Sequence, residues 1–305
     1  MRPAGSARAA PVLTPAFLSR LPGLRLKAKA VLEGALAGQH RSPFHGYSSE
    51  FAQYRGYVPG DDMRFLDWKV FGRRDQLVTR QYRDETNTAV HLLVDTSASM
   101  GYRAIGPSGK PDPASPTKLE TACTLAAALA LLAGRQRDTV ALAHGGDKLD
   151  AYRPPAGGAH AVDEVLQRLE GLSAGGRTDL KALFAQLAAR LAGQSFVFLF
   201  TDLWQDPAEI AAGLRHVRRK SRAVTVVQLR TRDEEEFFTG DAVSLRDLET
   251  GAVLEVAADG TRVAYIDAVR AHARRVAAEC AALDLRLAVV RTDEPLDGAL
   301  RRMLG

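Results

Sequence analysis

The sequence predicts an α/β fold in which a mainly parallel central sheet is covered by helices on both faces. From Asn87 onward, short apolar runs typical of buried strands alternate with stretches of helical length and pattern. Strands separated by helices of about 10–20 residues favour parallel pairing. Residues 1–87 lack this alternation. We therefore predict an N-terminal helix and a wrapping segment at 1–87, followed by the α/β domain at 88–305.

The individual elements follow from periodicity and from turn residues. Thr117-Lys-Leu-Glu120 has the pattern of a capping box that opens a helix. Gly145-Gly146 indicates a hairpin turn. Residues 231–258 break the rhythm around the turn Glu249-Thr-Gly251, so an inserted hairpin is expected there. Strands are predicted at 90–94, 139–143, 148–152, 195–200, 223–229 and 285–290, and helices at about 15–36 (interrupted at Pro22-Gly23), 117–133, 161–170, 179–192, 207–219, 261–283 and 295–303.

Composition limits the cellular setting. No apolar stretch approaches the roughly 20 residues that a membrane-spanning helix needs, so we expect a cytoplasmic protein without a membrane span. Cys123 and Cys280 lie in alanine-rich helical patterns, which favours reduced thiols over a disulfide framework. Residues 1–87 hold 14 Lys and Arg against 8 Asp and Glu, while the remainder is nearly balanced at 27 against 28. An acidic partner, a membrane surface, nucleic acid or a self-paired surface all fit this excess.

Polar side chains follow the strands at the edge where ligands bind in open α/β sheets. Asp95-Thr-Ser97-Ala-Ser99 comes after the first strand, and Asp202 follows the strand at 195–200. Thr178, in the loop Gly175-Gly-Arg-Thr178-Asp179, precedes a helix. Hard oxygen ligands from three loops suit Mg²⁺, with Mn²⁺ or Ca²⁺ as alternatives. His and Cys are absent from these loops, so zinc is a poor candidate.

Each of these residues also has a purely structural interpretation. Ser and Asp after a strand are common turn and N-cap residues. Thr178 alone would serve to cap the following helix, and Asp202 alone would serve to close a turn before Pro207. The three loops together, in this order along the sheet, favour the metal site over these separate roles.

The set Asp95, Ser97, Ser99, Thr178 and Asp202 resembles the metal-ion-dependent adhesion site of von Willebrand factor A domains, which have a Rossmann-like fold. The resemblance implies that the hydroxyls coordinate Mg²⁺ and that the aspartates contribute directly or through water. It also implies an open position that takes a carboxylate from a protein partner. Arg177 departs from the glycine usual at its position.

A second resemblance is carried by a segment that contains Glu50, Tyr54, Arg55, Asp61, Asp62, Arg64, Asp67 and Trp68. It resembles the signature of the bacterial domain-of-unknown-function 58 family, in its short branch without membrane helices, and the resemblance covers residues 25–305. Gln81-Tyr-Arg-Asp-Glu85-Thr86-Asn87 and Val290-Arg-Thr-Asp-Glu-Pro295 also match that family. The resemblance implies work beside a MoxR-type AAA+ ATPase or its client, in protein maturation or remodelling.

The signature segment also has a physical interpretation. Pro59-Gly60-Asp61-Asp62 is a turn sequence, and the arginines and aspartates around it are able to pair with one another. Such a network, with its aromatic neighbours, would fix the segment onto the sheet domain. The alternative is a second binding surface, or a carboxylate that completes the metal site.

Three functions compete. A metal-dependent protein-binding adaptor is favoured, without catalytic residues, because the sequence shows neither a Walker motif nor Gly-x-Ser-x-Gly. The alternative is a Mg²⁺-dependent hydrolase or phosphotransferase that uses the same carboxylates. Nucleic-acid binding is disfavoured because cations are favourable at a helix C-terminus in any case. That third function would use the basic N-terminal segment and Arg215, Arg218, Arg219, Lys220 and Arg222.

Overall fold

The computed structural model describes residues 14–37, 51–56, 68–74, 76–82, 88–106, 109–193, 195–237 and 242–305. The chain divides into two compact units, one formed by 1–40 together with 89–305 and the other by 41–88. Among the described residues, no helix combines the length and the apolar character needed to cross a membrane.

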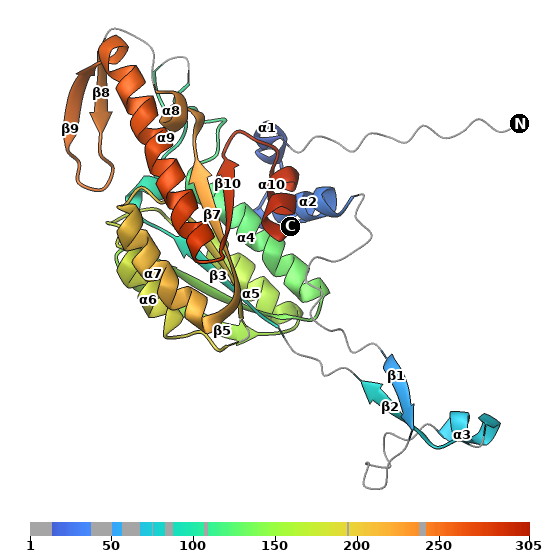
Figure 1. Ribbon diagram of the computed structural model, residues 1–305. Coiled ribbons are helices and arrows are strands. Elements are labelled where there is room, and N and C mark those ends of the chain that lie inside the picture. Colours follow the sequence, from blue (N-terminus) through green and yellow to red (C-terminus); the bar gives the residue numbers. More distant parts are fainter. Residues whose placement is uncertain are drawn as a thin grey trace, which may run out of the picture. The chain divides into compact units, whose positions relative to one another are not determined.

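The first unit is built on a six-stranded sheet with the order β10-β7-β6-β3-β4-β5 (Figure 1). All neighbouring pairs are parallel except β4 and β5, which form the predicted antiparallel hairpin. β3 and β6 are almost entirely buried apolar runs, as expected of central strands covered on both faces. The strands are β3 (Ala89–Asp95), β4 (Thr139–Gly145), β5 (Leu149–Ala156), β6 (Ser195–Thr201), β7 (Ser221–Arg230) and β10 (Arg286–Arg291).

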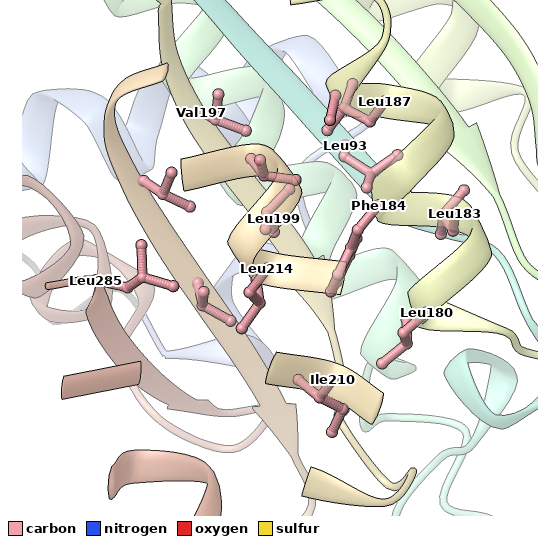
Figure 2. Close-up of a cluster of buried hydrophobic side chains, with 14 of the residues drawn as sticks. Leu93, Leu180, Leu183, Phe184, Leu187, Val197, Leu199, Ile210, Leu214 and Leu285 are labelled. Carbon is pink, nitrogen blue, oxygen red and sulfur yellow. The ribbon is translucent and has the colours of Figure 1, made fainter. Parts of the chain in front are cut away.

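Helices cover both faces of this sheet, as the alternating sequence pattern predicts. α6 (Leu180–Ala188), α7 (Pro207–Lys220) and α9 (Ala258–Ala282) lie on one face. Their apolar side chains pack against Leu93, Val197 and Leu199 of the strands, with Phe184 fully buried between them (Figure 2).

The other face is covered by α4 (Lys118–Arg135) and α5 (Ala159–Glu170). The predicted capping box is present at the start of α4, between Thr117 and Glu120. The helix continues one residue past Gly134, its expected end. Because most of its residues are alanine or leucine, α4 is buried along almost its whole length. This burial fixes the position of Lys118, the first residue of the helix.

The N-terminal helices belong to the first unit. α1 (Pro15–Leu18) and α2 (Leu24–Leu36) are separated at Pro22-Gly23, as predicted. α2 packs against α4 and α10 (Leu296–Leu304) through side chains that include Val31 and Leu32, both fully buried. The predicted grouping of this helix with the signature segment therefore differs from the observed division, because its apolar face is buried in the α/β unit.

The expected insertion at 231–258 contains a hairpin and a short helix. β8 (Ala242–Arg246) and β9 (Val253–Ala257) pair antiparallel around the predicted turn. α8 (Arg232–Glu236) precedes them and was not predicted. The acidic run Asp233-Glu-Glu-Glu236 forms this helix because Thr231 and Glu234 make a capping box at its start.

The second unit contains β1 (Phe51–Gly56), α3 (Trp68–Arg74) and β2 (Val78–Tyr82), with β1 and β2 antiparallel. Of the signature residues, Tyr54 and Arg55 lie in β1, and Trp68 begins α3, where its ring packs edge-on against Phe71. Arg/Asp pairing in this segment stays a prediction. The remaining signature residues, Glu50, Asp61, Asp62, Arg64 and Asp67, lie outside the described residues.

Candidate functional site

The candidate site lies where β3 and β6 end side by side. The two strands are in parallel register up to Val94 and Phe200, so Asp95 and Thr201 end neighbouring strands at one edge. Thr201 Oγ1 donates a hydrogen bond to Asp95 Oδ2 at 2.7 Å, and the Ser97 amide donates to Asp95 Oδ1 at 2.9 Å. Both Asp95 oxygens are therefore held in place, and the residue is buried, with 1% of its surface exposed.

The two serines of the predicted set face each other directly after this strand. Ser97 precedes a short 3₁₀ helix, Ala98–Gly101, which turns the chain so that Ser99 lies on the same side. The Oγ atoms of Ser97 and Ser99 are 3.1 Å apart. Two neighbouring oxygen ligands of an octahedral Mg²⁺, each at about 2.1 Å, lie about 3 Å apart. The hydroxyl spacing thus fits two adjacent positions around such a cation.

The loop with Thr178 is docked onto this serine loop by backbone hydrogen bonds. The Gly175 amide donates to the Thr96 carbonyl at 2.8 Å, and the Ala98 amide donates to the Gly176 carbonyl at 3.1 Å. Gly146, at the β4–β5 turn, lies beneath the loop. A Cβ at Gly146 would come within 2.4 Å of the Arg177 carbonyl oxygen. The close approach of three backbones explains why glycine occupies this position.

Thr178 does not cap the helix that follows it. Asp179 caps α6 by accepting the Ala182 amide at 2.9 Å, so it is committed to the helix end. Thr178 donates both its hydroxyl, at 2.6 Å, and its amide, at 3.0 Å, to the carboxylate of Glu249. Gln205 fixes the loop by donating to the Thr178 carbonyl and accepting the Leu180 amide, at 2.8 and 2.7 Å. The alternative role of Thr178 as an N-cap is therefore wrong.

Asp202 is bound to a buried lysine that the sequence did not indicate. Lys118 Nζ donates to Asp202 Oδ2 and to Glu234 Oε1, both at 2.7 Å, and its side chain is 1% exposed. The Asp202 backbone carbonyl accepts from Gln228 at 3.0 Å. The available signal was a lysine at the start of an alanine- and leucine-rich helix, but the partners of this lysine lie 84 and 116 residues away in sequence.

The electrostatic environment of the site follows from this burial. Burial, with the carboxylate of Asp202 nearby, raises the pKa of Asp95 to about 7. Burial alone would lower the pKa of Lys118, but the carboxylates of Asp202 and Glu234 outweigh it and raise that pKa. Lys118 remains charged and neutralises part of the acidic cluster. A cation at Asp95 would favour its ionised form, since metal charge inverts the effect of a neighbouring carboxylate.

The donor atoms suit a hard cation and are mostly hydroxyls. Among the described residues there is no group of three or more His, Cys, Asp or Glu side chains that could hold a metal ion. The predicted set differs from such a group because it combines two aspartates with Ser97, Ser99 and Thr178. Metal binding by this set stays a prediction.

A cavity of about 210 Å³ adjoins the site at Ser99. Its polar lining includes Asp233, which accepts the Tyr102 hydroxyl at 2.6 Å and the Ile105 amide at 2.9 Å. The β8–β9 hairpin forms another wall through Leu245, Arg246 and Leu248. The inserted hairpin and its acidic helix thus border the strand-end site. The sequence alone did not indicate that the insertion lies there.

The architecture confirms the predicted fold class, a mixed α/β fold with a mostly parallel six-stranded sheet. Similar solved structures include BatB from Bacteroides thetaiotaomicron (13% identity, TM-score 0.43, covering 70% of this chain and 93% of that one). An aerotolerance-related membrane protein from Bacteroides fragilis is 16% identical with a TM-score of 0.44, over 71% and 98% of the two chains. The SpRpn10 VWA domain is 11% identical with a TM-score of 0.36, over 70% and 93%.

The chain belongs to the family described as "Protein of unknown function DUF58", whose model matches residues 53–275. This confirms the family predicted from the signature segment. Among its relatives, "Uncharacterized protein Rv1480" from Mycobacterium tuberculosis is 28% identical over 286 residues, covering 92% of this chain and 86% of that protein. "Uncharacterized protein YeaD" from Bacillus subtilis is 37% identical over 65 residues, 21% and 16% of the two chains.

Proposed function

We propose that this chain is a cytoplasmic, divalent-metal-dependent protein-binding adaptor rather than an enzyme. Mg²⁺ would be held by Asp95, Ser97, Ser99, Thr178 and Asp202, and an acidic side chain of a protein partner would take the open position. The observation that carries the proposal is the pair of serine hydroxyls 3.1 Å apart beside a buried carboxylate at the edge of the sheet. Hydroxyl-rich sites of low negative charge leave a bound Mg²⁺ able to accept a further carboxylate.

The proposed partner is a MoxR-type AAA+ ATPase or its client, in protein maturation or remodelling. Support comes from the family resemblance, which implies this partnership. The cation would supply the attraction for the partner's carboxylate. The chain's own residues would hold the cation in place and keep bulk water from Asp95, which is buried beneath the serine loop.

The first experiment tests the cation. Thermal unfolding of the wild type is compared with Asp95→Ala and Ser99→Ala in EDTA, Mg²⁺, Mn²⁺ and Ca²⁺. A cation present at about 100 times its Kd stabilises the folded state by about 2.7 kcal/mol, so the wild type should melt at a clearly higher temperature. Neither variant should respond. Ser173→Ala, an exposed serine shortly before the Thr178 loop, is the matched control and should respond like the wild type.

An equal metal-induced rise in the wild type and in both site variants would contradict the proposal. Binding to a purified MoxR-type ATPase is then measured for the same variants, and it should require both Mg²⁺ and Ser99. Hydrolysis of nucleotides and phosphoesters with Mg²⁺ is assayed in parallel. Turnover that disappears in Asp95→Ala would favour the hydrolase or phosphotransferase alternative instead.

A further inference from the structure

The β8–β9 hairpin places a third carboxylate at the candidate site. Glu249 lies in the turn between the two strands and accepts both the hydroxyl and the amide of Thr178. Thr178 is the residue whose hydroxyl is expected to face the cation. Glu249 is half-buried, whereas its turn neighbours Asp247, Leu248 and Thr250 are partly to fully exposed. Glu249 is thus a point at which the hairpin contacts the loop that carries Thr178.

The turn is built to hold Glu249 in this position. Asp247 accepts the amides of Glu249 and Thr250 at 2.8 and 3.2 Å, and the Thr250 hydroxyl at 2.6 Å. Gly251 follows with a φ of +76°, a conformation that glycine adopts without strain. The hydrogen bond from the Thr250 side chain, and then those from the two backbone amides, lower the pKa of the Asp247 carboxyl. A turn fixed by four residues presents the glutamate without a large cost in conformational freedom.

The carboxylate of Glu249 forms no ion pair with any residue that the structure describes, because no Lys, Arg or His among them lies within salt-bridge distance. Lys118, a buried cation that lines the adjoining cavity, is paired with Asp202 and Glu234 instead. Glu249 accepts the two bonds from Thr178 through separate oxygens, Oε1 from the hydroxyl and Oε2 from the amide. Its negative charge suits a cation bound beside Thr178.

We infer that Glu249 is the internal counterpart of the partner's carboxylate: it completes the cation site in the free chain, and the partner's acidic residue must displace it. The inference rests on the proposed function. Displacement of the hairpin would remove Leu245, Arg246 and Leu248 from one wall of the adjoining cavity and uncover Ser99.

The test compares two glutamates of the same hairpin in the full chain. Glu249→Gln keeps the shape and one of the two acceptor oxygens but removes the charge. Glu255→Gln makes the same change at an exposed position on β9. Mn²⁺ binding is measured by calorimetry, after thermal unfolding in EDTA has shown that both variants fold. Removing a unit charge close to a divalent cation should weaken Mn²⁺ binding by about tenfold or more in Glu249→Gln. Glu255→Gln should match the wild type.

Hydrogen exchange of the hairpin provides the second measurement. Mn²⁺ should slow exchange over residues 242–257 in the wild type and in Glu255→Gln, and leave it unchanged in Glu249→Gln. Unchanged or tighter Mn²⁺ binding by Glu249→Gln would overturn the inference, since Glu249 would then only tether the hairpin to Thr178. If that variant binds normally while Ser99→Ala does not, the adaptor proposal survives. Absence of Mn²⁺ binding by the wild type overturns both.

Discussion

At the scale of single residues, Lys118 should be essential for the stability of the folded chain, because it is the shared partner of two carboxylates. In Lys118→Met, the carboxylates of Asp202 and Glu234 lose this buried partner. Removing one member of a buried charge cluster costs about 3–5 kcal/mol of unfolding free energy, because the remaining charges are left uncompensated. Denaturant titration of the variant measures this loss. Lys181→Met, at an exposed position on α6, should stay within about 0.5 kcal/mol of the wild type. Equal stability of both variants would show that the Lys118 cluster contributes little.

The spacing of Asp95, Ser97 and Ser99 after a buried strand predicts that the two hydroxyls meet, and they do. Lys118, Glu234 and Glu249 carry no such signal, because each contacts a residue far away in sequence and local patterns do not encode such contacts.

At the scale of elements, periodicity and capping predict most strands and helices. The capping box at Thr117 and the Gly145-Gly146 turn both appear where expected. The acidic run at 233–236 interrupts the alternating pattern of the sequence. In the structure it forms a short helix, with a capping box between Thr231 and Glu234 and acidic side chains in the first turn, where the helix dipole favours negative charge. The docking of the Thr178 loop onto the serine loop was beyond local reasoning, since it depends on how closely three backbones approach at Gly146.

Gly146→Ala should separate these two loops. The added methyl would clash with the Arg177 carbonyl oxygen, 2.4 Å from the new carbon, and backbone atoms have little room to yield. Overpacking of this kind costs about 1–3 kcal/mol, and the moved loop should bind Mn²⁺ more weakly. Gly175→Ala is the control, because a Cβ there meets open space within the same loop. Thermal unfolding and Mn²⁺ titration of both variants test this prediction. Equal melting temperatures and equal Mn²⁺ affinities would argue against a loop held by close backbone contact.

At the scale of the whole molecule, the order of the elements was enough to predict the fold class. It was not enough to predict that the N-terminal helices belong to the same compact unit as the α/β sheet. α2 is amphipathic, but its pattern does not say which apolar surface it covers. The structure places its buried face against α4 and α10 in the α/β unit. Partners of an amphipathic helix are set by the complementary surface that the rest of the chain offers.

The two cysteines allow the cohesion of this unit to be measured from both faces of the sheet. Cys123 lies in α4, and Cys280 lies in α9 with the cluster around Phe184. Burial raises the pKa of their thiols to about 12 and about 11, with Glu120 and Glu279 adding to the effect. Since only the exposed thiolate reacts, a disulfide reagent should label either residue only after the chain opens.

Labelling should therefore slow when the folded state binds its cation. With metal at about 100 times its Kd, global opening becomes about 100-fold rarer, so both thiols should react about 100-fold more slowly. Cys123→Ala and Cys280→Ala separate the two rates, and Asp95→Ala should remove the metal effect. If metal protects Cys123 but not Cys280, α9 opens on its own, and the two helical layers are not one cooperative unit. Rapid labelling of either thiol in the native chain would contradict its burial.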